Sequence, residues 1–196
     1  MTEDRPSRRV TLASGLEADI RPLLRRDLSG VLTLERALVE HGEGMVRGPE
    51  ELPLSEEGWA RELSSWLSPG NSEHGLYVVA RLRGGGAVPV LGSGEIRRLG
   101  PRRVRHVGML ALGVHPAHRR LGLGAALMTT LLEWADARLH RVELAVQSSN
   151  RAARALYHRF GFVEEGRRAD FVRRDDGTYE ADIIMARLRA SAGSEA

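Results

Sequence analysis

The stretch LALGVHPAHRRLGLGAAL, residues 110–127, decides the fold of this chain. Its apolar first half predicts a strand that ends at Val114, and Pro116 blocks the continuation of that strand. The pair Gly122 and Gly124 then opens a long amphipathic helix, predicted over residues 122–138. Glycines at a helix start let a ligand approach backbone N–H groups that have no partner within the helix. Together with the helix dipole, those groups favour a phosphate or pyrophosphate.

The glycine loop does not match two common nucleotide-binding motifs. No third glycine follows Gly124 at the spacing of the dinucleotide fingerprint, and the chain has no Lys for a P-loop. Arg119 and Arg120 lie at the same mouth and add positive charge. The loop is therefore predicted to be an anion cradle of another kind, and the alternative is a tight turn whose glycines serve packing.

The segments before this stretch predict strands and two helices. Residues 10–20 are typical of extended chain around Ser14-Gly15. Asp27 is predicted to cap a helix that stops at Gly42 and Gly44. A second helix is predicted from Ser55 to Pro69-Gly70. Strands are predicted over residues 76–82, 88–99 and 104–114, with candidate bulges at Gly92 and Gly94.

The segments after it complete an α+β pattern. A strand is predicted over residues 141–146, a helix over 150–160, and a hairpin with strands at 169–173 and 178–188 around Asp175-Asp176-Gly177. A helix that links the strands at 104–114 and 141–146 implies one parallel pair with a right-handed crossover. Hairpins elsewhere make the other pairs antiparallel. The predicted fold class is therefore α+β with a mixed sheet.

Length and composition indicate a single globular domain. The chain has 196 residues, of which 42% are hydrophobic, and a domain takes roughly 100–200 residues. We expect the domain over residues 9–189, with disordered tails at 1–8 and 190–196. No apolar run approaches the ~18 residues of a membrane span, and the first residues lack the apolar centre of a signal peptide. Because the chain has no cysteine, we expect a cytoplasmic protein without disulfides, thiolate metal sites or a cysteine nucleophile.

The basic residues do not predict a nucleic-acid partner. All 29 are Arg, which keeps the sequence pI near 10.1 although the net charge is only +3. They are spread along the chain, and no basic run is interleaved with aromatic residues. No spacing of His, Asp and Glu indicates a metal site. We therefore expect neither nucleic acid nor membrane nor metal as a partner.

Two motifs resemble the GNAT superfamily of acyl-CoA-dependent N-acetyltransferases. The first is the pyrophosphate loop Arg/Gln-x-x-Gly-x-Gly/Ala, carried by Arg119, Gly122 and Gly124. The second is Asn-x-x-Ala-x-x-Leu-Tyr followed by Gly-Phe, carried by Asn150, Ala153, Leu156, Tyr157, Gly161 and Phe162. The motifs lie on consecutive helices separated by one strand, in the order and at the distance found in the family. Residues 42–75 match nothing in the family pattern.

The resemblance implies a fold and a cofactor site. The expected fold is a mixed, mostly antiparallel sheet with helices on both faces, in which the one parallel strand pair splays around acetyl-CoA. The pantetheine amides would pair with the backbone of Leu112, Gly113 and Val114. The pyrophosphate would bind the N–H groups of residues 120–125, beside Arg119. Asn150 and Ala153 would line the other side. The residues of this loop are Arg120, Leu121, Gly122, Leu123, Gly124 and Ala125.

Acyl transfer to an amine needs a base for the amine and a proton for the leaving thiolate. Tyr157 occupies the family's acid position, and the alternative is a core tyrosine that packs beside Phe160. Glu95, on the strand before the loop strand, is the first candidate for the base, and His106 and His115 are the others. Glu35 on the first helix is a candidate for attracting a cationic acceptor. Ser148-Ser149 is interpreted as helix capping.

The predicted function is transfer of an acetyl group from acetyl-CoA to a primary amine. That amine is a free amino acid, a small amine or a peptide or protein N-terminus. Because the chain has no cysteine, direct attack in a ternary complex is favoured over an acyl-enzyme. The alternative is a non-catalytic module that binds or senses acyl-CoA. Homodimers are common in the family, and the composition does not decide the oligomeric state.

Overall fold

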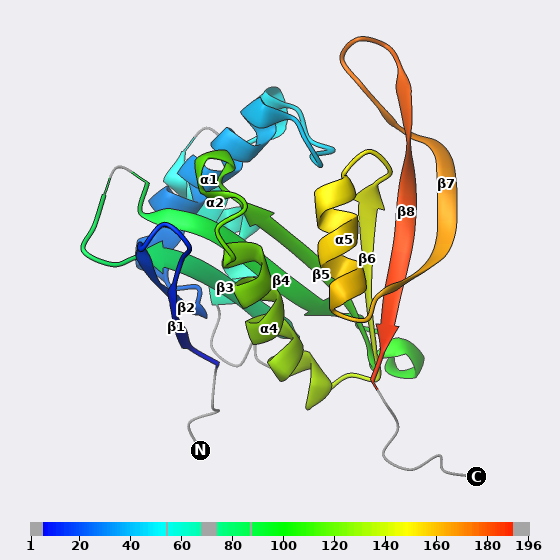
Figure 1. Cartoon of the computed structure of the whole chain (residues 1–196), viewed down its shortest axis with the longest axis horizontal. Helices are drawn as coiled ribbons and strands as arrows, with labels where there is room; N and C mark the ends of the chain where they lie inside the picture. The colour runs from blue at the N-terminus through cyan, green and yellow to red at the C-terminus, as the bar shows by residue number, and fades with distance from the viewer. Residues whose placement is uncertain (1–5, 54, 68–73, 87, 190–196) are drawn as a thin grey trace.

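The computed structural model describes residues 6–53, 55–67, 74–86 and 88–189. Within these residues the strands form one sheet in the order β1-β2-β3-β4-β5-β6-β8-β7 (Figure 1). Every neighbouring pair is antiparallel except β5 and β6, which are parallel. The strands are β1 Arg8–Thr11, β2 Glu17–Pro22, β3 Gly75–Leu82, β4 Val90–Arg98, β5 Val107–Val114, β6 Arg141–Gln147, β7 Val163–Arg173 and β8 Tyr179–Leu188.

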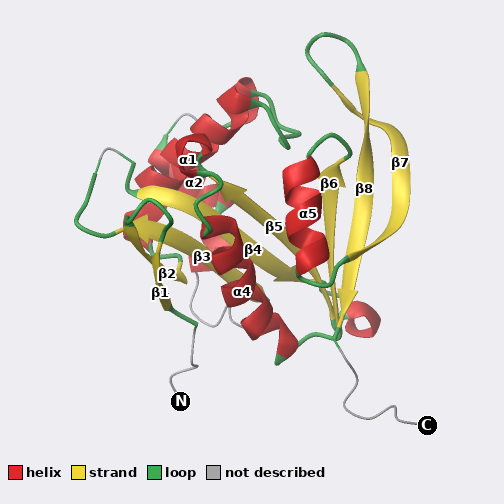
Figure 2. Ribbon diagram, in the orientation of Figure 1, coloured by secondary structure: helices red, strands yellow, loops and turns green. Residues whose placement is uncertain are grey.

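Helices lie on both faces of the sheet (Figure 2). The α-helices are α1 Leu28–His41, α2 Glu56–Glu62, α3 Ser64–Leu67, α4 Leu123–Asp136 and α5 Arg151–Arg159. Short 3-10 turns are η1 Arg25–Asp27, η2 Pro49–Glu51, η4 Arg102–Val104 and η5 Pro116–His118. The mixed sheet with one parallel pair and helices on both faces confirms the predicted fold class. None of the helices in the described ranges is long and apolar enough to cross a membrane.

Two hydrophobic cores lie on opposite faces of the sheet. The first core joins α4 and α5 to one face and includes Leu127, Leu131 and Tyr157. The second core joins α1, α2 and α3 to the other face and includes Leu34 and Trp59. Burial of these side chains is the main stabilising contribution, at about 25 cal/mol for each Å² of apolar surface removed from water.

The parallel pair separates along its length. Pairing between β5 and β6 is confined to Val107–Met109 of β5 and Arg141–Glu143 of β6. Both strands continue beyond these residues, β5 to Val114 and β6 to Gln147, without further pairing to each other. The splay that the resemblance implied is therefore present, and it opens toward the carboxyl ends of both strands.

The glycines of β4 do not form the bulge expected at Gly92 or Gly94. The register shifts between Ala80 and Arg81, so the extra residue on β4 is Leu91. Gly92 and Gly94 instead leave room for α4. A Cβ atom at Gly94 would lie 2.8 Å from Cδ1 of Leu131. These glycines therefore serve close approach of the helix to the sheet.

Asp27 precedes α1 but does not cap it. Its buried carboxylate accepts hydrogen bonds from Arg21 at 2.7 and 2.8 Å, from Arg81 at 3.1 Å and from the N–H of Leu24 at 2.9 Å. A buried charge needs such partners, and they take the oxygens that a cap would use. At the other end, Gly42 ends α1 with a φ of 74°.

Several element boundaries differ from the sequence expectation. Residues 102–104 form a 3-10 turn, so β5 begins at Val107. The helix from Ser55 is divided at Leu63 into α2 and α3, and the expected stop at Pro69-Gly70 lies outside the described residues. β7 begins at Val163, six residues before the expected strand. The expected tail at 190–196 and residues 1–5 of the expected tail at 1–8 lie outside the described residues. Strand β1 begins at Arg8, the last residue of that expected tail.

Candidate functional site

The gap between β5 and β6 exposes backbone groups of β5. The N–H of His115 donates to the C=O of Leu91 at 2.9 Å, and in an antiparallel ladder the bonded residues alternate. Residues 111 and 113 therefore direct their peptide groups to β4. Leu112 and Val114 direct theirs into the gap. These two residues present the pattern that an extended ligand needs if it is to pair with a strand edge.

Gly113 has a different place from its two neighbours. It is the cross-strand partner of Ser93 on β4, and its peptide groups belong to that ladder. A Cβ atom at Gly113 would lie 2.5 Å from Cδ1 of Leu38, so the missing side chain gives α1 room to pack. The backbone contact of Gly113 with pantetheine stays a prediction, and the geometry favours Leu112 and Val114 for it.

The loop before α4 contains a row of backbone N–H groups without partners among the described residues. Arg120 and Gly122 have positive φ angles, 63° and 90°, and a left-handed residue before a helix forms a concave anion-binding turn. Within the described residues, the N–H groups of residues 120–125 have no hydrogen-bond acceptor, while the N–H of Ala126 donates to Gly122. The left-handed φ of Arg120 is unusual for a residue with a side chain and is typical of functional turns. The loop therefore fits a pyrophosphate.

Arg119 and Asn150 have partners within the chain. Arg119 donates from Nε to the C=O of Val114 at 3.3 Å and from Nη1 to Glu43 at 2.6 Å. Asn150 accepts from the N–H of Ala153 at 3.0 Å and so caps α5. The cap that was assigned to Ser148-Ser149 therefore belongs to Asn150. Both residues stay predicted cofactor contacts, with Ala153 partly buried behind the cap.

Tyr157 lies on α5, on the α4 side of the sheet. Its side chain is 7% exposed and packs against Phe162 with ring centroids 6.0 Å apart, where the alternative interpretation named Phe160. Burial raises the pKa of Tyr157 to about 12. No described residue forms a hydrogen bond with its hydroxyl. The hydroxyl is therefore protonated at neutral pH and available to another acceptor.

Glu95 lies on the opposite face of the sheet from Tyr157. Its cross-strand neighbour is Tyr77, which belongs to the second core, and directly opposed residues share a face. The Glu95 side chain is 26% exposed, and its nearest cation is Arg97 at 3.9 Å. Burial raises the pKa of Glu95, and the charge of Arg97 opposes that shift. A carboxylate with a raised pKa is a better proton acceptor at neutral pH.

Two further carboxylates accompany Glu95. Burial raises the pKa of Glu35 on α1 to about 7; the charge of Arg47 lowers it, and those of Glu62 and Glu95 raise it further. Glu62 at the end of α2 pairs with Arg47 at 2.6 Å. Glu95, the candidate base, and Glu35, the candidate for attracting the acceptor, are therefore near each other. Glu62 was not predicted, because nothing in its local sequence distinguishes it from other exposed helix carboxylates.

The two histidine candidates have structural partners. His106 lies before β5, at the paired end of β5 and β6, where its C=O accepts from His140 and Arg141. His115 accepts at Nδ1 from the N–H of Ala117 and caps a 3-10 turn. Burial, followed by the nearby charges, lowers the pKa of His115. No group of three His, Asp or Glu in the described parts of the chain is placed to hold a metal.

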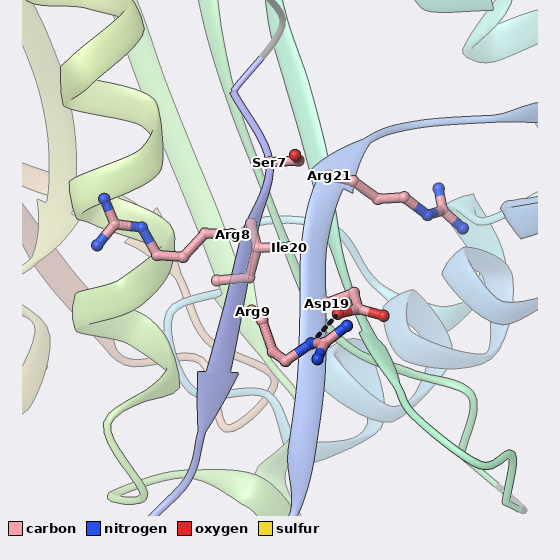
Figure 3. Close-up of a pocket in the computed structure, with 6 residues that line it drawn as sticks. All are labelled: Ser7, Arg8, Arg9, Asp19, Ile20 and Arg21. Atoms are coloured by element: carbon pink, nitrogen blue, oxygen red, sulfur yellow. Dashed lines mark ion pairs between the residues drawn. The ribbon is translucent and has the colours of Figure 1, made fainter.

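A separate concavity lies at the β1 edge of the sheet. Figure 3 shows its lining residues, and Arg9 pairs with Asp19 at 3.5 Å. Arg8 points toward α4 and Arg21 points the opposite way (Figure 3). The three guanidinium groups therefore do not converge on a shared ligand. The lining consists of Ser7, Arg8, Arg9, Asp19, Ile20 and Arg21.

Solved structures share this fold. An acetyltransferase of the GNAT family from Streptococcus pneumoniae aligns with a TM-score of 0.75 at 24% identity, covering 86% of this chain and 98% of that protein. A second solved structure is a GNAT superfamily phosphinothricin acetyltransferase from Sinorhizobium meliloti in complex with acetyl-CoA. It aligns with a TM-score of 0.74 at 21% identity, covering 90% of this chain and 92% of that protein. At these identities the likeness concerns the fold.

Sequence relatives match part of the chain. The N-alpha-acetyltransferase RimI of Mycobacterium tuberculosis is 36% identical over 102 residues, which are 52% of this chain and 61% of the relative. The [ribosomal protein bS18]-alanine N-acetyltransferase of Escherichia coli K12 is 40% identical over 76 residues, which are 38% of this chain and 51% of the relative. These matches thus span about half to three-fifths of each relative.

The family model described as Acetyltransferase (GNAT) family matches residues 46–162. This range covers more than half of the chain and contains the whole of β5, the glycine loop, β6 and α5. It therefore includes both motifs and the gap between the splayed strands. The chain belongs to the GNAT acetyltransferase family.

Proposed function

We propose that this protein is an N-acetyltransferase that moves the acetyl group of acetyl-CoA to a primary amine. The observation that carries the proposal is the gap between β5 and β6. The peptide groups of Leu112 and the N–H of Val114 line one side of it, while the C=O of Val114 accepts from Nε of Arg119. The N–H groups of residues 120–125 follow in the loop after β5. Tyr157 and Glu95 lie on opposite faces of the same sheet. A thioester in the gap would have one of these groups on each side.

The backbone supplies most of the binding in this proposal. Acetyl-CoA supplies an acetyl group activated as a thioester. Leu112 and Val114 hold the pantetheine arm as a strand edge holds another strand, and the row of N–H groups at α4 holds the pyrophosphate. Backbone contacts of this kind depend on φ angles, which explains why glycine and a left-handed Arg120 stand in the loop.

Two side chains move protons. The amine must lose a proton before it can attack, and Glu95, directly or through a water, accepts that proton. The amine nitrogen then bonds to the acetyl carbon as the C–S bond breaks, and Tyr157 donates its hydroxyl proton toward the leaving sulfur. The chain has no cysteine, so no acyl-cysteine precedes this attack.

The acceptor is a primary amine: a free amino acid, a small amine, or the N-terminus of a peptide or protein. The names of two relatives, an N-alpha-acetyltransferase and an alanine N-acetyltransferase acting on a ribosomal protein, support an N-terminal amine. Glu35, Glu62 and Glu95 support a substrate that arrives as an ammonium ion, because these three carboxyl groups lie near enough to influence one another's charge. A cytoplasmic location stays a prediction, as does a homodimer.

A panel of amines tests this proposal. The protein is incubated with acetyl-CoA and with free amino acids, diamines and short peptides, and the products are identified by mass spectrometry alongside thiol release. Peptides with an acetyl-blocked N-terminus serve as the control. The expected result is acetylation of a free amine and none of the blocked peptide. Binding of acetyl-CoA without an acetylated product from any amine would support the acyl-CoA-sensing alternative.

A further inference from the structure

The loop after α1 contacts both sides of the open gap. We name residues 42–45 the strap, and Figure 1 shows this loop reaching from α1 toward the N-terminal end of α5. Gly42 and Gly44 have φ angles of 74° and 78°. A Cβ atom at Gly44 would lie 3.0 Å from Nδ2 of Asn150. The strap thus approaches a predicted cofactor residue through a position where glycine leaves the space open.

Gln147 fixes the strap to β6. Its Oε1 accepts from the N–H of Gly44 at 3.2 Å, and its Nε2 donates to the C=O of Met45 at 2.9 Å. Gln147 is the last residue of β6 and is 5% exposed. Both halves of a buried amide are therefore used on the backbone of a loop about a hundred residues away in sequence.

Glu43 fixes the strap on the β5 side. Its carboxylate accepts from Nη1 of Arg119 at 2.6 Å and also lies 3.4 Å from Nε2 of His41. Arg119 directly follows η5, at the entrance to the glycine loop, and holds the C=O of Val114 with its Nε. The strap therefore bridges the diverging ends of β5 and β6.

We propose that Glu43 competes with the pyrophosphate of acetyl-CoA for the guanidinium of Arg119, and that binding of acetyl-CoA releases Glu43 and detaches the strap on the β5 side. The inference rests on the proposed function, because it takes the glycine loop as the pyrophosphate site. In the structure, a carboxylate takes the Nη1 donor that a phosphate oxygen would use. A phosphate brought to Arg119 would also be repelled by the carboxylate of Glu43.

Release of Glu43 leaves the strap attached on the β6 side alone, where its contacts are the two hydrogen bonds of Gln147. With one of its two attachments lost, the strap opens more often and exposes the N–H of Gly44, while Arg47, just beyond the strap, keeps its ion pair with Glu62. Two binding events that act on one shared contact are coupled, and the coupling is reciprocal. Acetyl-CoA that draws Arg119 away from Glu43 therefore loosens one end of a loop beside the acceptor carboxylates.

The test compares E43Q with E40Q, which removes the same charge from the exposed last turn of α1. Binding of CoA is measured by calorimetry at 0.15 M salt. Because exposed ion pairs contribute modestly, we expect E43Q to bind CoA about threefold to tenfold more tightly than the parent, and E40Q to change by less than about twofold. Unchanged or weaker binding by E43Q would overturn the inference, since it would show that Glu43 does not compete or that it positions Arg119.

Two further measurements complete the test. In an R119Q background, E43Q should improve CoA binding by less than about twofold, because the contested group is gone. Hydrogen exchange at residues 43–46 should accelerate when CoA binds the parent and should already be fast in free E43Q. Slower exchange on CoA binding would contradict release of the strap. If the parent binds no CoA, the proposed function fails; if it binds CoA and E43Q behaves as the parent, only this inference fails.

Discussion

Tyr157→Phe removes one hydroxyl from a side chain that is 7% exposed. The contact of the ring with Phe162, at 6.0 Å between centroids, involves no oxygen and should persist. No described residue is hydrogen-bonded to the hydroxyl, so its loss should change the free energy of unfolding by less than about 1 kcal/mol. Urea unfolding of parent and variant measures this quantity.

Turnover should fall far more than stability. The pKa of Tyr157 is raised to about 12 by burial, whereas a thiol titrates near 8.5. Complete transfer of the proton from Tyr157 to the released thiolate is therefore uphill by roughly 3.5 pKa units, or about 5 kcal/mol, and transfer to the sulfur before C–S cleavage is less favourable still. The proton must instead be shared with the sulfur as its charge develops. Loss of such a partial transfer typically costs about 10²-fold in rate, or about 2.7 kcal/mol.

The assay measures kcat by thiol release with the acceptor that the amine panel identifies. Acetyl-CoA affinity, measured by calorimetry, should change by less than about fivefold, which corresponds to about 1 kcal/mol. The defect should shrink with an acetyl donor whose leaving thiol is more acidic. Tyr179→Phe is the matched control, because Tyr179 is an exposed tyrosine on β8. Parental turnover in Tyr157→Phe would refute the acid assignment and leave Tyr157 as a packing residue.

Three other substitutions test the loop, the base and the frame around α1. Gly122→Val places a branched side chain at a φ of 90°, and calorimetry should show at least about tenfold weaker acetyl-CoA binding, about 1.4 kcal/mol; unchanged affinity in a folded variant would contradict the cradle. Glu95→Gln should lower the rate of acetyl transfer at pH 7, and the difference in rate between parent and variant should narrow toward pH 9 as the amine deprotonates unaided. Burial raises the pKa of Glu95, so the parent's rate rises with pH through that pKa. The pH–rate profile of the variant lacks this rise. Asp27→Asn should destabilise the fold by about 3–5 kcal/mol at pH 7 in urea melts. Burial by itself would raise the pKa of Asp27, but the hydrogen bonds from Arg21 and Leu24 lower it overall, so this stabilisation exists above the unfolded pKa of about 3.9 and is lost as pH falls through the folded pKa. If the parent and Asp27→Asn differed in free energy of unfolding by the same amount at pH 7 and at pH 3, that result would contradict the role given to the Asp27 carboxylate.

Features encoded by neighbouring residues were predictable from the sequence. The strand ending at Val114, the glycine start of α4 and the short strand after it together specify a parallel pair joined by a helix. The left-handed angle at Gly122 follows from residue type. The splay itself came from the family resemblance, because no local pattern shows that pairing stops at Met109.

Features that depend on distant contacts were missed or wrongly assigned. Asp27 resembles a helix cap in the sequence, but its buried carboxylate accepts hydrogen bonds from Arg21 and from Arg81, which is 54 residues away. Gly92 and Gly94 resemble bulges until α4 packs on them. Glu62 and Gln147 were not identified, because their partners come from other elements. For Gln147 a signal existed, namely a polar residue at the end of an otherwise alternating strand.

Among the candidate catalytic residues too, those in a local motif were predictable and those that depend on distant contacts were not. Tyr157 stands in a motif, so its place on α5 was predictable. His115 was a candidate base by residue type alone, and its hydrogen bond with the N–H of Ala117 could not be read from spacing. The raised pKa of Glu35 arises from burial among three elements, so only the fold brings it beside Glu95.

The most direct test of the central claim is residue-resolved hydrogen exchange of the protein with and without acetyl-CoA. If acetyl-CoA lies between β5 and β6, exchange should slow by at least about tenfold at the amides of Leu112 and Val114 and across residues 120–125, as expected for newly bonded N–H groups. Gly113, whose amide already faces β4, should change least in this strand. Protection confined to other parts of the chain, or none at saturating acetyl-CoA, would contradict the account.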